Sequence, residues 1–244
     1  MLTIIGVIVG FVMGITGAGG ALVAIPLFME FLHMNLREAS VYSLIAVVIA
    51  SLSNFYYQRK YADISLAIGF VLSSAAGSLI SGPYKSLIPE TWIAILLGLI
   101  ALYSLYSVWL PKKYINSTNQ EKSHPFKTLV VGLTLGILTT FTGLGGGVLM
   151  MPILMRIYKF HQDKAVATSL VVVGFSSLIS FLIQVKGGYF FKMSFDLLGL
   201  IAGIFVTSYV LKLLTKKISP KTFENLRKLV FTFVVFLSLG KIFF

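Results

Sequence analysis

The chain has 244 residues, of which 57% are hydrophobic and only 11% are charged, and its mean hydropathy is +0.93. Soluble domains carry about 25% charged residues, so this composition predicts an all-α integral membrane protein. The formal net charge of +12 would suggest nucleic-acid binding in a soluble protein, but here it fits positive loops at a membrane, and we expect no nucleic-acid partner. The chain has no cysteine, which excludes disulfides, thiol catalysis and thiolate metal sites.

Two halves with the same plan follow one another along the chain. Each half opens with a long apolar stretch that a glycine-rich segment interrupts, at 3–32 and again at 126–158. Each then continues with segments long enough to span a bilayer, at 39–57, 64–82 and 90–110 and at 165–185, 194–214 and 222–244. An extended polar stretch lies between the halves. We therefore expect a first membrane repeat at 1–111, a cytoplasmic linker at 112–126 and a second membrane repeat at 127–244.

The two glycine-rich segments match residue by residue. The first, GFVMGITGAGGALVAIP, ends at Pro26, and the second, GILTTFTGLGGGVLMMP, ends at Pro152, which is 126 residues later. The same offset aligns further identical pairs through the first two-thirds of each half, among them Ser51 with Ser177 and Gln58 with Gln184. An ungapped match of this length indicates an internal duplication.

The positive charges indicate that the duplicated halves are inverted in the membrane. If each broken stretch is a hairpin that enters and leaves on one face, fifteen of the twenty Lys and Arg residues fall on one side, and five on the other. If each stretch crosses once, the division is nearly even. Because positive residues collect in the cytoplasm, we expect the inverted arrangement, with the linker inside and both termini outside. Whether the hairpins are re-entrant or cross fully stays open.

The glycine-rich segments are the predicted substrate site. Glycines this dense break a helix, and a broken backbone within a membrane is tolerated where it lines a cavity. We expect a new helix to begin near 19–21 and near 145–147, and its free N–H groups and positive dipole end favour an anion. The binding residues expected on this ground are Thr16, Gly17, Ala18, Gly19, Gly20, Thr142, Gly143, Leu144, Gly145, Gly146 and Gly147. The threonines are expected to cap the new helices or to donate to the ligand. Glycines spaced by four, such as Gly6 and Gly136, are expected only to allow close helix packing.

Polar side chains on the span after each segment form a second group of candidates. They are Asn54 and Gln58 in the first half and Ser180 and Gln184 in the second, with serines on the same helices at positions 43, 51, 169 and 177. Hydrogen bonding between helices is the equally weighted alternative. Glu30 and Asp196 would suggest proton coupling if they lay within the membrane, but both fall near predicted span ends, where an interfacial position is favoured. No metal constellation, cofactor motif or nucleophile with a base is evident.

The paired Thr-Gly-x-Gly-Gly segments, each followed by a proline and each opening one of two similar halves, resemble the sulfite exporter TauE/SafE family of permeases. The resemblance covers nearly the whole chain. It implies a permease that moves sulfite, sulfoacetate and related sulfonates or small carboxylates across the plasma membrane. It agrees with the anion site that the helix termini predict, although Ala21 stands where the second segment has Gly147, so the two segments need not contact the substrate equally.

These observations together predict a multi-pass transporter for small anions that works by alternating access. An anion channel of the same fold, a membrane-embedded enzyme and a cation carrier that uses glycine carbonyls are the alternatives. The enzyme is disfavoured because no His, Asp or Glu cluster lies within the predicted spans. The exact substrate, the direction of transport, coupling to protons or another ion, and the oligomeric state are left open.

Overall fold

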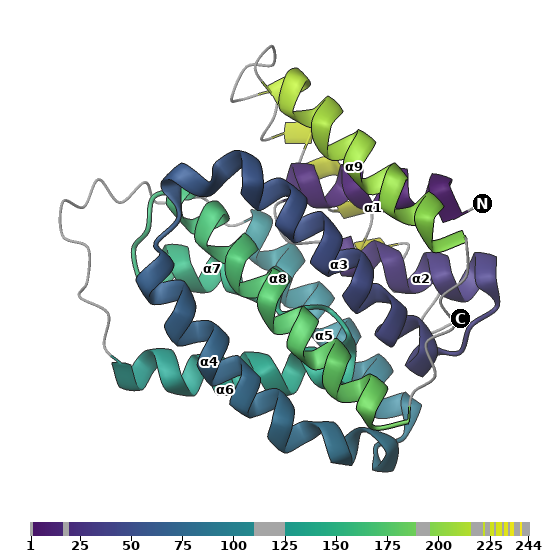
Figure 1. The fold of residues 1–244 in the computed structure, drawn as a ribbon. Helices are drawn as coiled ribbons and strands as arrows, with labels where there is room; N and C mark the ends of the chain where they lie inside the picture. The colour runs from purple at the N-terminus through teal and green to yellow at the C-terminus, as the bar shows by residue number, and fades with distance from the viewer. Residues whose placement is uncertain are drawn as a thin grey trace.

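The computed structural model describes residues 2–16, 20–109, 125–188 and 196–215, with scattered positions between 222 and 240. The chain is drawn in Figure 1. The described α-helices are α1 (Leu2–Thr16), α2 (Gly20–Leu32), α3 (Leu36–Gln58), α4 (Ile64–Ser81), α5 (Glu90–Trp109), α6 (Pro125–Thr142), α7 (Gly147–Arg156), α8 (Gln162–Lys186) and α9 (Asp196–Thr215). Two 3₁₀-helices, η1 (Arg59–Tyr61) and η2 (Gly82–Leu87), follow α3 and α4.

The protein is an all-α membrane protein, as its composition predicts. Five of the described helical segments are long and apolar enough to cross a bilayer, and they begin at Leu36, Ile64, Glu90, Pro125 and Asp163. Among the helices around the glycine-rich segments, α6 is one of these spans, whereas α1, α2 and α7 have 15, 13 and 10 residues. A helix of 10 to 15 residues reaches about 15–22 Å, which is shorter than a hydrocarbon core of roughly 30 Å.

Most helix boundaries lie where the sequence predicts them. Helices α2 and α7 begin at Gly20 and Gly147, which confirms the two predicted breaks. Helix α3 begins at Leu36, three residues earlier than expected, because Asn35 and Glu38 form a capping box. The Glu38 N–H donates to Asn35 Oδ1 at 2.8 Å, and the Asn35 N–H reaches Glu38 Oε2 at 3.4 Å. The predicted linker at 112–126 lies outside the described residues, apart from the start of α6.

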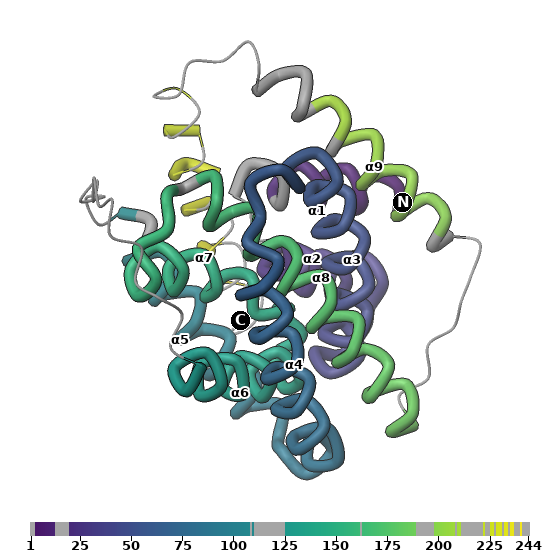
Figure 2. Tube along the Cα trace, turned by 60° about the vertical axis from the view of Figure 1, so that its left-hand side comes forward, coloured from purple at the N-terminus to yellow at the C-terminus, as the bar shows by residue number. Residues whose placement is uncertain are grey.

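Helices α3 and α8, which correspond in the repeat, form an antiparallel pair at the centre of the bundle (Figures 1 and 2). At one end, Asp63 lies shortly after α3. It forms an ion pair with Lys164 and a hydrogen bond with Thr168, and both of these residues lie near the start of α8. At the other end, the side chains of Ser40, near the start of α3, and Gln184, near the end of α8, bind the same lysine, Lys85. The two helices therefore run in opposite directions.

Two tightly packed helix pairs flank this centre. Helices α1 and α9 lie together beside α3, and α6 and α4 lie together beside α8. Glycines allow both contacts, because an ideal Cβ on Gly6 would lie 2.3 Å from the Leu200 carbonyl oxygen, and one on Gly136 would lie 2.0 Å from that of Ser74. The glycines spaced by four thus pack helices, as predicted.

The connections after α2 and α7 share an unusual backbone conformation. His33 has φ of 51° and Lys159, which is 126 residues later, has φ of 55°. Residues other than glycine seldom adopt positive φ, so its recurrence at the repeat offset shows that these corresponding turns have similar local geometry.

Candidate functional site

The second glycine-rich segment turns the chain sharply between α6 and α7. Gly143, Gly145 and Gly146 have φ of 72°, 68° and 67°, a conformation that side chains with a Cβ rarely adopt. Gly146 in this left-handed conformation is the N-cap of α7, and no side chain caps that helix. The glycines are therefore required by the backbone path itself.

The segment also lies against the central helix pair with no space for side chains. An ideal Cβ on Gly143 would lie 2.2 Å from the Ser40 carbonyl oxygen, and one on Gly145 would lie 2.5 Å from Ser177 Oγ. The Ser43 hydroxyl donates to the Gly143 carbonyl oxygen at 2.8 Å. Helix α3 contributes Ser40 and Ser43, and helix α8 contributes Ser177, so the turn lies between the two halves of the duplication.

Several backbone donors in this turn have no acceptor among the described residues. The Gly143 N–H donates to the Thr139 carbonyl and the Leu144 N–H donates to Thr142 Oγ1. By contrast, the N–H groups of 145–148 form no hydrogen bond of ordinary length and angle within the described part of the chain, although Gly145 and Gly146 lie in a turn. These residues are buried, and the positive end of the α7 dipole lies at the same place.

Two buried hydroxyl groups without a hydrogen-bond partner in the described structure lie beside the same turn. Ser177 Oγ and Thr139 Oγ1 lie beside Gly145 and Gly146, and neither forms a hydrogen bond with a described residue. Ser51, the repeat counterpart of Ser177, is likewise unpaired, and its Cβ lies beside Gly174 of α8. Buried polar groups are normally hydrogen-bonded, so a group of orphaned donors favours binding of an acceptor-rich ligand such as an oxyanion.

The cavity at this turn is small in the observed conformation. It has a volume of about 10 Å³, and Thr139, Thr142, Leu144 and Gly146 are among its lining residues. This is about the room that one water molecule needs. The observed conformation therefore has no room at this turn for an anion of several heavy atoms.

Thr142 does not cap α7, although capping is one of the two roles that the sequence suggests for it. Its hydroxyl donates to the Leu138 carbonyl at 2.6 Å and accepts from the Leu144 N–H at 3.3 Å. It therefore closes the end of α6, and the prediction that it caps α7 is wrong. The physical reason is that positive φ at three glycines carries the chain away from Thr142 before α7 begins.

The structure brings Ser180 close to α4 and Gln184 close to α6, but it leaves Asn54 and Gln58 elsewhere. Ser180 Oγ is 2.8 Å from Ser78 Oγ, and Gln184 Nε2 donates to the Thr140 carbonyl at 3.3 Å. Asn54 Nδ2 donates to the Ala50 carbonyl of its own helix. Gln58 is partly exposed at the end of α3 that points away from Ser40.

The first glycine-rich segment is described except for residues 17–19. Thr16 is the last residue of α1, and Gly20 begins α2 and is buried. The predicted site residues Gly17, Ala18 and Gly19 lie outside the described residues. Among the acids considered for proton coupling, Glu30 is exposed near the end of α2, and Asp196 is the first residue of α9.

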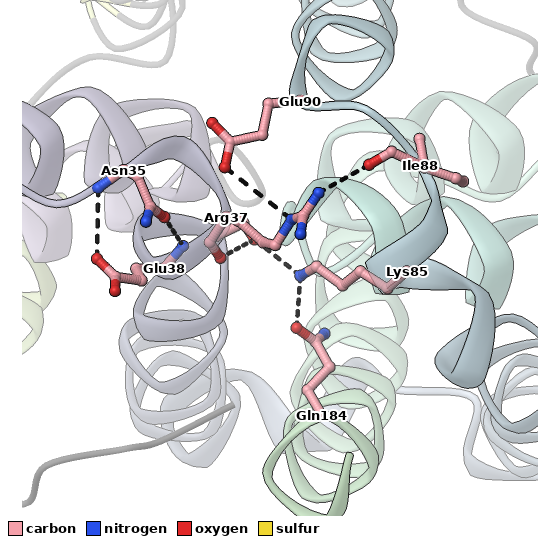
Figure 3. A network of polar contacts seen from close by, with 8 residues as sticks. Asn35, Arg37, Glu38, Lys85, Ile88, Glu90 and Gln184 are labelled. Carbon is pink, nitrogen blue, oxygen red and sulfur yellow. Dashed lines mark hydrogen bonds and ion pairs between the residues drawn. The ribbon is translucent and has the colours of Figure 1, made fainter. Parts of the chain in front are cut away.

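Sequence reasoning gave no functional role to Lys85, which lies between the predicted spans 64–82 and 90–110. In the structure its side chain has a relative exposure of 0%, the only charged residue in the described chain that is buried. Its ammonium group donates to Ser40 Oγ at 2.8 Å and to Gln184 Oε1 (Figure 3). No local pattern distinguishes this lysine from a solvated one, because its burial depends on the packing of η2 against α6 and α8 and on the contact of its side chain with Ser40 of α3.

Arg37 lies beyond Lys85 on the same side of the bundle. Its guanidinium donates to the Ile88 carbonyl at 2.8 Å and lies 4.0 Å from Glu90, and both side chains are partly exposed (Figure 3). We call the group Ser40, Lys85 and Gln184 the Lys85 end of the central helix pair. Arg37 places a second positive charge between that group and the exposed surface.

The opposite end of the central pair, which we call the Asp63 end, consists of Asp63, Lys164 and Thr168. Lys164 Nζ lies 2.9 Å from Asp63 Oδ2, and the Asp63 N–H donates to Thr168 Oγ1 at 3.0 Å. Partial burial disfavours the charged carboxylate, but hydrogen bonds from Lys164 and the Leu66 N–H, together with the Lys164 charge, outweigh it. The pKa of Asp63 therefore lies below its ordinary value of 3.8.

Comparison with known proteins places this architecture in a family. The model of the family described as "Sulfite exporter TauE/SafE" matches residues 2–240, which is nearly the whole chain. The chain belongs to the sulfite exporter TauE/SafE family. This confirms the resemblance that the paired glycine-rich segments suggested.

Curated TauE/SafE relatives are named as transporters. The chain is 30% identical to the "Probable membrane transporter protein MJ0441" of Methanocaldococcus jannaschii over 239 residues, covering 88% of this chain and 87% of the relative. It is 24% identical to the "Probable membrane transporter protein YunE" of Bacillus subtilis over 204 residues, covering 73% and 75% of the two chains. No solved structure matches the chain. The family and its relatives thus identify an integral membrane transporter.

Proposed function

We propose that this TauE/SafE protein is a secondary transporter for small anions, namely sulfite, sulfonates or other small organic anions, in the plasma membrane. The observation that carries the proposal is the turn at Gly143–Gly147, where unpaired N–H groups at the start of α7 meet the unpaired hydroxyls of Ser177 and Thr139. All of these groups are donors. An oxyanion accepts from several donors at once, and charge-assisted hydrogen bonds are about twice as strong as neutral ones.

Alternating access between inverted repeats is the mechanism we propose. Three features support it: α3 and α8 correspond in the repeat and run antiparallel, the α1/α9 and α6/α4 pairs pack in equivalent ways, and the cavity at the turn is too small for an anion. In such transporters one repeat rocks against the other around a site near the midplane. The proposed orientation has the linker in the cytoplasm, with proton or ion coupling left open.

The test uses one serine in the proposed site and one outside it on the same helix. Ser177→Ala removes an unpaired buried hydroxyl, so we expect unchanged or slightly higher thermal stability. We expect its dissociation constant for the tightest-binding anion among sulfite, sulfoacetate and acetate to rise by about ten- to a hundredfold, because one charge-assisted hydrogen bond is lost. Isothermal titration of the full chain in detergent measures this.

Ser176→Ala is the matched control. Ser176 is buried on α8 next to Ser177, and its hydroxyl donates to the Val172 carbonyl of its own helix. We expect this variant to bind anions as the wild type does. Equal affinity in Ser177→Ala and wild type, or binding of cations instead of anions, would remove the proposal. Saturable counterflow in liposomes is expected for a transporter, whereas linear uncoupled flux would identify a channel.

A further inference from the structure

Lys85 occupies a buried position that the proposed transport function does not yet use. It projects from η2, which packs close to α8 because Gly82 has no side chain: an ideal Cβ there would lie 2.5 Å from Ile183 Cγ2. Desolvating an ammonium group costs several kcal/mol, so a buried lysine within a membrane protein marks a functional site by default.

Of the two residues that bind Lys85, Ser40 also contacts the glycine turn, and Gln184 also contacts the end of α6 that leads into it. Ser40 accepts from the lysine through Oγ, while its carbonyl lies against Gly143. Ser43 donates to both the Ser40 and the Gly143 carbonyls, at 2.8 Å each. On the other side, Gln184 accepts from the lysine and donates to the Thr140 carbonyl, two residues before the end of α6. A single residue, Ser40 on one side and Gln184 on the other, thus connects the ammonium to the surroundings of the proposed anion site.

Ser40 Oγ and Gln184 Oε1 are neutral acceptors, and this makes them exchangeable. A substrate oxygen can take the place of either one, and the serine and glutamine left behind carry no charge that would need a new partner. The N-terminus of α7 offers only about half a positive charge, whereas Lys85 in its protonated form supplies a full one. A net negative substrate in a medium of low dielectric gains most from that full charge.

We propose that Lys85 pairs with the substrate anion between the glycine turn and the Arg37 side of the bundle, exchanging its hydrogen bonds to Ser40 and Gln184 for substrate oxygens. The inference rests on the anion transport proposed above. It restricts the substrate class to small oxyanions that carry at least one full negative charge. Arg37, which is partly exposed beyond Lys85 and lies 4.0 Å from the more exposed Glu90, adds a second positive charge on that side.

The test compares charge removal at Lys85 with charge retention and with a lysine at the Asp63 end. Sulfite, sulfoacetate and acetate are titrated into full-length wild type, Lys85→Met, Lys85→Arg and Lys164→Met in detergent. We expect the dissociation constant to rise at least tenfold in Lys85→Met and to stay within severalfold in Lys85→Arg. Lys164→Met breaks the ion pair with Asp63, and we expect this variant to change the dissociation constant by no more than twofold. Unfolding without ligand is measured in parallel, since removing a buried charge need not lower stability.

The outcomes separate this inference from the function it rests on. Weakened binding in Ser177→Ala with wild-type binding in Lys85→Met would overturn the role of Lys85 and leave the anion site standing. Equal weakening in Lys85→Met and Lys164→Met would also overturn it, because both lysines would then act only through the packing of α8. Absence of anion binding in the wild type would overturn both proposals. If Lys85→Met does not fold, Lys85→Gln, which lacks the charge and keeps a donor, gives the same comparison.

Discussion

The two ends of the α3/α8 pair are held by different chemistry. At the Asp63 end, a lysine and a carboxylate pair directly, and about a quarter of each side chain is exposed. At the Lys85 end, an ammonium with 0% exposure donates to a serine and a glutamine. Exposed ion pairs contribute up to about 1 kcal/mol, whereas removing a partner from a buried charge is costly.

This difference bears on transport as well as on stability. The proposed transport mechanism requires α3 and α8 to separate alternately at their two ends. When the Asp63 end opens, water can solvate the charges of Asp63 and Lys164. The Lys85 end exposes a cation that attracts anions. The comparison therefore suggests that the Asp63 end only holds the two helices together, whereas the Lys85 end also takes part in anion binding. Three predictions test this difference.

The largest effect is expected for Gln184→Leu. This change removes an acceptor from the buried Lys85 ammonium and a donor from the Thr140 carbonyl, so we expect a loss of about 1.5–3 kcal/mol of unfolding free energy. The double variant Lys85→Met/Gln184→Leu is expected to recover part of it, because no charge is then left short of an acceptor. Unfolding in detergent measures this double-mutant cycle, and additive losses would show that the lysine and glutamine are not coupled.

A smaller effect is expected for Asp63→Asn, below about 1 kcal/mol and reduced by salt. Its pH dependence has a definite sign. Since the pKa of Asp63 is lower in the folded protein, its stabilisation is full above the unfolded value of 3.8 and is lost as the pH falls through the folded value. The stability difference between wild type and Asp63→Asn should shrink below about pH 4.

The matched control at the Asp63 end is Asp163→Asn. Asp163 lies 3.8 Å from His161, and both side chains are largely exposed, so its neutralisation should alter stability less than that of Asp63. A constant difference between wild type and Asp63→Asn down to pH 3 would contradict the proposed electrostatic origin.

The smallest effect is expected for the exposed lysines Lys60 and Lys186, which correspond in the repeat and lie near opposite ends of the central pair. If they attract anions to the two openings, replacing either by Gln should raise the half-saturation constant of transport by no more than about tenfold. The same change should make that constant less sensitive to salt. Unchanged values in liposome uptake assays would identify both as solvated loop charges.

Much of the fold follows from local patterns that the sequence displays directly. Glycine density located the starts of α2 and α7, apolar runs located the spans, and the offset of 126 revealed the duplication. The early start of α3 was also encoded, since Asn35 and Glu38 have the spacing of a capping box. These features depend on neighbours within a few residues, or on identity between two segments, and both can be read without a structure.

Tertiary structure alone decided which polar groups are paired and which charge is buried. The serines at 51, 169 and 177 look alike in the sequence, yet Ser169 bonds its own helix, and Ser51 and Ser177 have no partner among the described residues. Lys85 lies in a segment that reads as a turn, and its burial arises from contact with residues 45 positions before it and 99 after it. Such contacts produce no periodic pattern in the amino-acid sequence, because their free energy depends on how helices that are distant in the chain pack together.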